Sequence, residues 1–446
     1  MTSMSVTSAT TSTTSMSATA MDVTSATSAP HRWEPRAWAG CAVAAAGLAV
    51  LTDLAPHRIW GWCAATGYAA AALVARRGAR AREGVPEGRL LPATPVLLAL
   101  LGSAVLPLLV LVVLGKGQLE VEVVERSGDL LLSTASPYVE VPRAVAEFNP
   151  YLPGMALFGA LPGDARWWTG GVFAVTLLMT VRVGAGANGR VGAGASGRPG
   201  LVPYVLACPL VALSLAVGGV DLPVAGLLCL GLTLADRRGP GLAGLALGAA
   251  CALKWTAWPA LPVAVALVAV RGGARPALRC ALVALVPPLA VVLPVALAHP
   301  GSFYANAVAF PLGLTGTTSP AASPLPGYLL ATWLPGGRTL ALALLAGSAL
   351  VVGLSLVLRP PATGAAASRR LALGLGLAMC LMPATRFGYL VYPFVLWATT
   401  LRPGAVPVAY VRELPGPTAR PGRPRLPAPK PIAPRACPPA PERTPA

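Results

Sequence analysis

The sequence predicts an all-α protein, a polytopic bundle of about twelve transmembrane helices with a long extracytoplasmic loop. Of its 446 residues 55% are hydrophobic and only 11% are charged, and the mean hydropathy is +0.66. A soluble domain carries about a quarter charged residues. Because so few charges cannot cover a globular surface of this size, lipid must cover much of it. Apolar stretches of about 17–25 residues, the length that crosses a bilayer as a helix, recur along the chain.

Twelve apolar stretches are the predicted spans. They lie near 37–55, 59–76, 93–114, 167–184, 200–218, 222–236, 240–253, 256–271, 277–298, 338–358, 370–384 and 387–402. Their Ala, Leu, Val and Gly side chains suit close packing of helices in a bilayer. Several stretches are short, so two of them fit tilted or re-entrant segments equally well.

Arginine marks one set of the segments that connect these spans, and basic segments stay on the cytoplasmic side. They are Arg76–Arg82, Arg182–Arg198, Arg237–Arg238, Arg271–Arg279 and Arg359–Arg370. The opposite set contains the two long loops, 115–166 and 299–337, which are therefore expected outside the cytoplasm. An even number of spans places both termini in the cytoplasm, and the plasma membrane is the expected location.

The chain is expected to divide into three parts. Residues 1–36 form the predicted disordered cytoplasmic arm, since their first thirty are almost entirely Ser, Thr, Ala and Met and lack the basic start of a signal peptide. Residues 37–402 hold the transmembrane bundle. Residues 403–446, rich in Pro and Arg, are the predicted disordered cytoplasmic tail, which anionic lipid headgroups would attract.

Several function classes are not supported by the composition. The net charge of +18 lies mostly in short loops and the tail, without the basic-aromatic motif of a nucleic-acid module. The eight cysteines form no CxxC pair, and the three histidines are scattered, so no metal site is predicted. The glycines of 184–200 lack the Lys-Ser/Thr of a phosphate loop, and no DxD-like pair would hold a metal-bound nucleotide sugar. No cofactor is expected.

Acidic residues gather in loop 115–166, which has seven acidic and four basic residues and hence a net charge of −3. The chain has only 16 acidic residues in all. The stretch that begins at Glu120 can continue as helix from the third span, which places Glu122 and Glu125 on one face by their i, i+3 spacing. A solvated acidic helix face explains the cluster equally well.

Two proline turns follow in the same loop. Ser136-Pro-Tyr138 and Asn149-Pro-Tyr151 are turn-forming sequences in which proline restricts φ. Residues 151–162 are apolar but too short to span a bilayer. They are expected to form a re-entrant or interfacial helix that lies against the bundle.

Lys254 interrupts an apolar run, with Trp255 and Trp258 beside it at interface depth. A lysine at the bilayer centre costs about 2.5–3.5 kcal/mol, so its presence there indicates a partner. A side chain that snorkels to the outer surface avoids most of this cost, and this alternative stays open.

Arg386 lies in the turn between the last two spans, with Tyr389 nearby. Arginine binds phosphate through two parallel hydrogen bonds, and the neighbouring aromatic side chains can stack on sugar or lipid. Asp221, in the short turn before the span at 222–236, can pair with either Arg386 or Lys254. It can also simply cap the following helix.

The acidic residue outside an early span, the Ser-Pro-Tyr about fifteen residues later and the Asn-Pro-Tyr-x-Pro together resemble a known family. They are similar to the first outer loop of polyprenyl-phosphate-sugar-dependent glycosyltransferases of the GT-C superfamily. The resemblance is strongest to glycosyltransferase family 87, which includes polyprenyl-phosphate-mannose-dependent α-mannosyltransferases of actinobacteria. It covers roughly residues 93–402, mostly as topology and short motifs. The Ala- and Arg-rich composition also fits a high-GC actinobacterium.

The resemblance implies that loop 115–166 is of catalytic type and that the chain is a hexosyltransferase. It would move a hexose, with mannose expected, from a polyprenyl phosphate to an extracytoplasmic lipid or glycan acceptor with inversion. The family's loop carboxylate is usually an Asp acting as general base. Here the position holds Glu, with Glu122 the preferred match and Glu120 and Glu125 close rivals.

The same resemblance implies roles for the other polar residues. Arg386 and Lys254 would hold the phosphate leaving group. The expected substrate-binding residues are Tyr138, Asn149, Tyr151, Asp221 and Tyr389. The uncharged loop 299–337 either lines a groove where lipid chain and sugar meet, with Asn306 and Ser319 as hydrogen-bonding groups, or passively caps the bundle.

A transporter or lipid flippase is the alternative. Transporters place polar residues near the bilayer midplane on broken helices, often with internal repeats. Here charged residues collect at one face and no repeat is evident, although Pro209 and Pro287-Pro288 could break helices. A non-enzymatic scaffold that recruits partners through its tails explains the long arms but not the acidic loop.

Overall fold

The computed structural model describes residues 33–81, 93–185, 200–237, 239–317 and 321–401. This part of the chain is helical, and its only strand-like contact is an isolated bridge between Ala322 and Thr385. The all-α prediction is therefore confirmed. Apart from residues 33–36, the predicted arm at 1–36 and tail at 403–446 lie outside the described residues.

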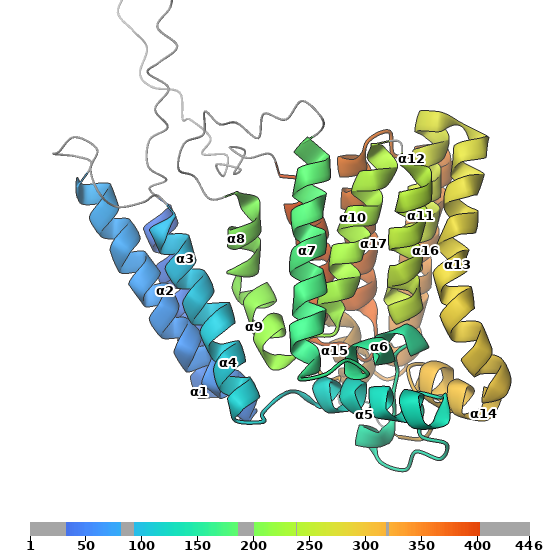
Figure 1. Cartoon of the computed structure of the whole chain (residues 1–446), viewed down its shortest axis with the longest axis horizontal. Helices are drawn as coiled ribbons and strands as arrows, with labels where there is room; N and C mark the ends of the chain where they lie inside the picture. The colour runs from blue at the N-terminus through green and yellow to red at the C-terminus, as the bar shows by residue number, and fades with distance from the viewer. Residues whose placement is uncertain (1–32, 82–92, 186–199, 238, 318–320, 402–446) are drawn as a thin grey trace, which may run out of the picture. The chain divides into compact units, whose positions relative to one another are not determined.

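Each of the twelve apolar stretches coincides with a helix or with consecutive helical segments (Figure 1). They are α1 (Glu34–Leu51), α2 (Ala55–Ala81), α3 with η2 and α4 (Thr94–Val113), α7 (Ala165–Ala185), α8 (Leu201–Leu206) with α9 (Pro209–Val217), α10 (Asp221–Asp236), α11 (Pro240–Leu253), η5 (Trp255–Ala257) with α12 (Ala260–Gly272), α13 (Ala274–Ala298), α16 (Gly337–Leu358), α17 (Gly364–Leu381), and η7 (Phe387–Leu390) with α18 (Val391–Ala398).

Four helical segments in the described ranges are long and apolar enough to cross a membrane. They are Thr94–Val113, Trp255–Gly272, Ala274–Ala298 and Gly337–Leu358. The last is almost wholly exposed, with Leu350 71% and Val357 78% accessible. Apolar surface of this extent is compatible with a membrane protein. The count of twelve spans stays a prediction.

Two hydrophobic clusters hold the helices together. The N-terminal bundle consists of α1–α4, α8 and α9 and packs around the buried rings of Trp60 and Tyr68. The Trp60 indole donates to the carbonyl of Ser103 at 2.7 Å, in the π-helical turn η2. The Tyr68 hydroxyl donates to the carbonyl of Ala207, where α8 ends, at 2.6 Å. These bonds tie α2 to the middle of two neighbouring segments.

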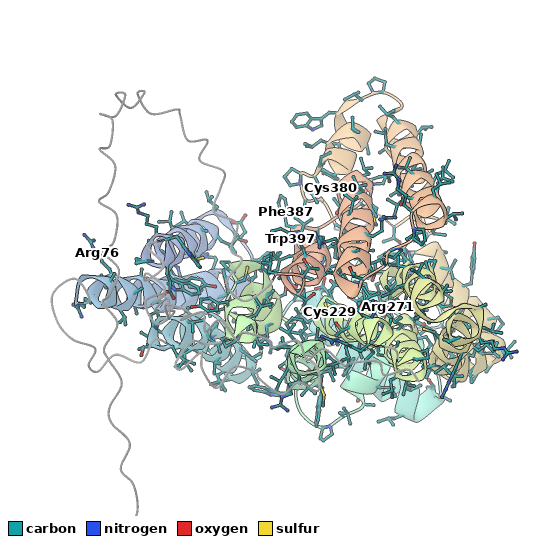
Figure 2. All side chains as sticks on the ribbon, turned by 90° about the horizontal axis from the view of Figure 1, so that it is seen from above. Arg76, Cys229, Arg271, Cys380, Phe387 and Trp397 are labelled. Carbon is teal, nitrogen blue, oxygen red and sulfur yellow. The ribbon has the colours of Figure 1, made fainter. Side chains whose placement is uncertain are left out.

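The C-terminal bundle consists of α7, α10–α13, α17 and α18 around a second apolar core. Short elements lie across one end of the helices: α5 (Leu119–Thr134), η3 (Val145–Glu147), η4 (Pro153–Met155), α6 (Ala156–Gly159), α14 (Pro300–Phe303), η6 (Tyr304–Ala309) and α15 (Pro326–Trp333) (Figure 1). We call this end the loop face. Figure 2 looks onto the opposite end, where Arg76 and Arg271 are labelled. The long loops and these two basic helix ends therefore lie at opposite ends, as the charge pattern predicts.

The stretch from Glu120 does not continue from the third span, and that prediction is wrong. The helix ends at Val113, and Gly115 adopts a positive φ of 60° that stops it. After the break the amide of Gln118 donates to the carbonyl of Val217 at 2.9 Å, and α5 begins at Leu119 as a separate helix. The acidic helix therefore lies across the loop face instead of extending α4.

The short apolar segment 151–162 is the 3-10 turn η4 followed by α6, which agrees with the short helix predicted there. The helices α5 and α6 approach so closely that neither contact residue has room for a side chain. A Cβ on Gly128 would lie 2.1 Å from the carbonyl carbon of Gly159, and one on Gly159 would lie 2.0 Å from the carbonyl oxygen of Val124. Both obstacles are backbone and cannot rotate away.

The substitution Gly159→Ala is therefore expected to destabilise the protein by about 3 kcal/mol, because α6 must move away from α5. The midpoint of thermal unfolding in detergent micelles measures the effect. Gly171→Ala is the matched control, since a Cβ there meets nothing within 4 Å. Equal midpoints for the two variants would contradict the close approach of α5 and α6.

Candidate functional site

Lys254 lies in the turn that follows the end of α11 at Leu253. Its backbone is extended (φ −157°, ψ 143°), a single 3-10 turn follows, and Pro259 precedes α12. Because α11 has only 14 residues, it is roughly 21 Å long. Its end at Lys254 therefore stops short of the level reached by the longer α7 and α13, and α6 lies over it (Figure 1).

Lys254 forms an ion pair with Asp221, at the start of α10, and the two side chains are only 12% and 11% exposed. The same carboxylate oxygen accepts a 2.7 Å hydrogen bond from the hydroxyl of Tyr392. Thr256 in turn donates to that hydroxyl at 3.0 Å. The residue at the N-cap position of α10 is Val220, so Asp221 does not cap the helix. It therefore pairs with Lys254, one of the two cations that the sequence offered.

Two tyrosine rings flank the Lys254 ammonium group. The nitrogen lies 5.4 Å from the centre of the Tyr151 ring and 5.0 Å from that of Tyr389. A cation at this distance is attracted by the ring quadrupole. Lys254 thus brings together residues from the Asn-Pro-Tyr loop, the α11–α12 turn and η7.

The Asn-Pro-Tyr turn is bound through its backbone to the end of α11, directly before Lys254. The amide of Leu152 donates to the carbonyl of Leu253 at 3.1 Å. The Asn149 side chain accepts from the amide of Tyr151 at 3.0 Å, and the Tyr138 hydroxyl donates to the Tyr151 carbonyl at 2.9 Å. Three predicted substrate-binding residues thus meet here, where Asn149 and Tyr138 position Tyr151. Burial also raises the pKa of Tyr138, so it remains a donor.

Asn306, within the π-helical turn η6, is fully buried. Its side-chain oxygen accepts from the amide of Asn149 at 2.9 Å, and its amide group donates to the carbonyls of Val139 and Ser302. The bonds to Asn149 and Val139 thus join loop 115–166 to the second long loop, and the bond to Ser302 lies within the second loop. Asn306 is therefore a clamp and does not line a groove, and Ser319 lies outside the described residues.

Arg386, the second predicted phosphate-binding cation, pairs with Glu120 in the first turn of α5. The turn that carries Arg386 is held by Thr385, whose amide donates to the carbonyl of Ala321 at 3.0 Å. The amide of Tyr389 donates to the Arg386 carbonyl at 3.1 Å. This turn therefore carries both Arg386, which pairs with Glu120, and Tyr389, whose ring lies against Lys254.

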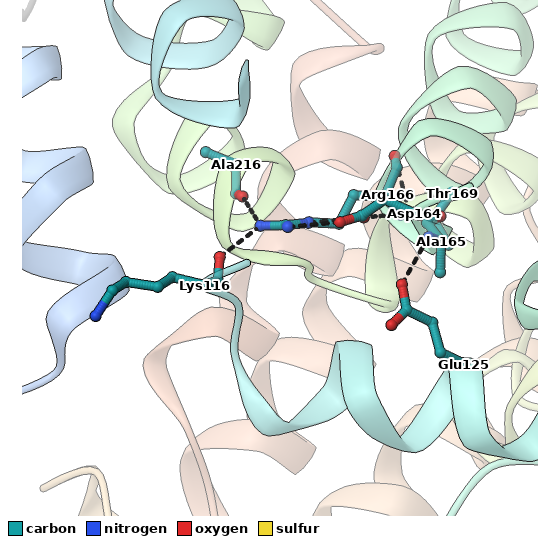
Figure 3. A network of polar contacts seen from close by, with 7 residues as sticks. All are labelled: Lys116, Glu125, Asp164, Ala165, Arg166, Thr169 and Ala216. Carbon is teal, nitrogen blue, oxygen red and sulfur yellow. Dashed lines mark hydrogen bonds and ion pairs between the residues drawn. The ribbon is translucent and has the colours of Figure 1, made fainter. Parts of the chain in front are cut away.

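The three candidate carboxylates have different environments. Glu120 is engaged by Arg386. Glu125 accepts from the amide of Ala165 at 3.2 Å, at the start of α7 (Figure 3). Glu122 is exposed, and among the described residues no hydrogen bond or ion pair engages it. Of the three, it is the carboxylate whose oxygens remain available to a ligand.

A buried guanidinium that the sequence did not single out connects this face to the N-terminal bundle (Figure 3). Arg166 is 3% exposed and binds both carboxylate oxygens of Asp164, at 2.8 and 2.6 Å. It also donates to the carbonyls of Lys116 and Ala216 at 2.9 and 3.1 Å. Burial raises the pKa of Asp164, but the hydrogen bonds from Arg166 outweigh it and keep that pKa below its usual value.

His57 is another residue that the sequence did not single out, beyond its being one of three scattered histidines. It lies near the start of α2, and its Nε2 is 3.1 Å from the side-chain nitrogen of Gln118. Its Nδ1 is buried without a hydrogen-bond partner among the described residues. Burial and, second, the positive charge of Arg386 lower its pKa.

This lowered pKa predicts an acid-sensitive fold. The unfolded chain takes up a proton near pH 6.5, but the folded His57 resists it, so stability falls as the pH drops below 6.5. His57→Gln is expected to reduce the loss of thermal midpoint between pH 7.5 and pH 5.5. The same substitution at His299 is the matched control. A loss unchanged by His57→Gln would contradict this role.

Tyr392 and Thr256 did not stand out in the sequence either, although Tyr392 follows Tyr389 at the i+3 spacing that brings side chains together. Two hollows elsewhere, of about 650 and 160 Å³, are lined by α1 and α2 and by residues around Arg271. No residue of the sites above lines either hollow. Within the described ranges, no three His, Cys, Asp or Glu side chains group so as to hold a metal ion.

Comparisons with known proteins add no assignment, since no family model, no curated protein and no solved structure matches this chain.

Proposed function

We propose that the chain is an integral membrane glycosyltransferase of GT-C type in the plasma membrane. It moves a hexose, with mannose expected, from a polyprenyl phosphate to an extracytoplasmic lipid or glycan acceptor. The observation that carries the proposal is the cluster at Lys254, where Tyr151, Tyr389 and Asp221 surround the ammonium group. In this topology twelve spans place both termini in the cytoplasm and the loop face outside.

The two cations are suited to a lipid phosphate. Lys254 is screened from water but retains Asp221 as its counter-charge, and Arg386 has Glu120. An incoming phosphate competes with these carboxylates for the cations and gains charge-assisted hydrogen bonds. Tyr392 continues to donate to Asp221 when the ammonium group turns to the phosphate. The half-buried ring of Tyr389 offers an apolar face on which a sugar can stack.

The transfer needs a base for the acceptor hydroxyl, and Glu122 is the proposed one. The acceptor oxygen forms a bond to the anomeric carbon while the bond from that carbon to the phosphate oxygen breaks. The hydroxyl proton passes to the carboxylate, and the polyprenyl phosphate leaves with the bonding electrons. The single displacement inverts the anomeric configuration. Glu120 and Glu125 are less suited, because Arg386 and the start of α7 engage them.

Transfer of labelled mannose from polyprenyl-phosphate-mannose by membranes that contain the full chain tests the proposal. Glu122→Gln is expected to lower transfer about 100-fold or more, within the usual range for a lost catalytic base. Glu140→Gln is the matched control, a second exposed carboxylate of the same loop. Full activity of Glu122→Gln would transfer the role to another carboxylate. If no polyprenyl-linked sugar is transferred, the proposal that the chain is a glycosyltransferase is refuted.

A transporter or lipid flippase is the second candidate, favoured by the ion pair of Lys254 and Asp221 at the interruption between α11 and α12. Buried pairs at such breaks also serve transport. Movement of a fluorescent polyprenyl phosphate across proteoliposomes, with no sugar transfer, would favour this function.

A further inference from the structure

The surface of η7 and α18 carries a row of bulky apolar side chains. Phe387, Leu390, Phe394 and Trp397 follow one another at intervals of three, four and three residues, which places them on one side of a helix. Phe387 and Trp397 are 50% and 45% exposed, while the two between them are half-buried. Viewed along the helices in Figure 2, Phe387 and Trp397 lie on the same side of the bundle. We call these four residues the aromatic row.

The aromatic row cannot turn inward. The other side of α18 is buried in the core through Val391, Tyr392, Val395 and Leu396. The hydroxyl of Tyr392 also binds Asp221. Rotation of the helix would break this bond and expose the buried side, so the row is fixed on the surface.

The row differs in composition from the exposed surfaces of α13 and α16. Aromatic residues make up 6% of the chain, yet they fill three of the row's four positions. The exposed large side chains of α16 and α13 are all leucine or valine, among them Leu350, Leu354, Leu282 and Leu289. Bulk lipid requires only an aliphatic surface of that kind, whereas planar rings suit a ligand that packs in one place.

A cation stands at the loop-face end of the row, directly before Phe387. The side chain of Arg386 is 30% exposed, and Glu120 is its one ion-pair partner among the described residues. The row extends over eleven residues, roughly 15 Å of helix, and is one side chain wide. These dimensions suit a single apolar chain that ends in an anionic head.

We infer that the aromatic row and Arg386 bind the isoprenoid chain and the phosphate of a polyprenyl phosphate. The inference rests on the proposed function and names the surface on which the donor enters. The phosphate at Arg386 then lies on the same turn as Tyr389, whose ring is 5.0 Å from the Lys254 ammonium. The phosphate of the bound lipid thus lies near Lys254, and its chain extends along α18 on the side of the bundle.

Photolabelling of the full chain in phosphatidylcholine nanodiscs tests the inference. The probe is a polyprenyl phosphate with a diazirine in its chain, and labelled peptides are located by mass spectrometry. Label is expected within 387–397 and is expected to be displaced by unlabelled polyprenyl phosphate but not by polyprenol. The double substitution of Phe394 and Trp397 by Ala is expected to lower displaceable labelling about tenfold. Arg386→Gln is expected to make phosphate and alcohol compete equally.

Trp333→Ala is one control, because this ring is 75% exposed on α15. The pair Leu350→Ala and Leu354→Ala on α16 is the other, and neither should change the labelling. Thermal midpoints verify that each variant is folded. Label spread evenly over α13 and α16, or undiminished in the Phe394 and Trp397 variant, would overturn the inference.

A parallel transfer assay separates the inference from the proposed function. If sugar is transferred but the label maps elsewhere, the lipid-binding role of the aromatic row is overturned and the glycosyltransferase function still stands. Displaceable label on the row without transfer of any sugar would support the lipid site and refute the enzyme.

Discussion

The substitution Asp221→Asn is expected to destabilise the protein by about 3–5 kcal/mol, because it leaves the buried Lys254 ammonium without its counter-charge. The asparagine oxygen still accepts from the hydroxyl of Tyr392. The double variant Asp221→Asn with Lys254→Met removes both charges and is expected to recover most of the stability. Denaturation in mixed micelles measures both effects.

The double variant also separates structure from chemistry. It is expected to fold but to transfer sugar at least about 100-fold more slowly, because it lacks a cation for the departing phosphate. Substantial transfer by the folded double variant would show that Lys254 is not a donor-binding residue. If Asp221→Asn alone leaves stability unchanged, the two side chains do not depend on one another.

The second large effect is expected at Arg166→Met, with a loss of about 3–5 kcal/mol. The substitution leaves the Asp164 carboxylate and the carbonyls of Lys116 and Ala216 without their donor. Adding Asp164→Asn should recover only part of the loss, since the two carbonyls remain unsatisfied. Arg143→Met is the control, because Arg143 is exposed in the same loop. Similar thermal midpoints for Arg143→Met and Arg166→Met would contradict the stabilising role of Arg166.

The helices were predictable because an apolar stretch of sufficient length has few alternatives to helix in lipid, where every backbone group must find an internal partner. The break before α5 was not predicted, although Gly115-Lys-Gly-Gln118 directly follows the apolar run. Glycine with a positive φ at such a position commonly ends a helix. The short helix after Asn149-Pro-Tyr151 was predicted, because prolines bound an apolar segment too short to span.

The candidate site was predictable where a polar residue interrupts an apolar run. Lys254 and Asp221 stand out for that reason, and the structure pairs them. Arg166 and His57 did not stand out, because Arg166 lies among other loop charges and His57 begins a helix. Their roles depend on distant backbone, as with the carbonyl of Ala216, 50 residues from Arg166. Such contacts leave no local pattern.

In the proposed topology the shortness of α11 has a consequence for the surrounding bilayer. With 14 residues it reaches roughly 21 Å, whereas the hydrocarbon core is about 30 Å thick. Hydrophobic mismatch of this size is relieved by local thinning of the leaflet, at a modest cost for each ångström. In that topology acyl chain length is expected to affect this protein, since a thinner bilayer brings its headgroup plane nearer to Lys254.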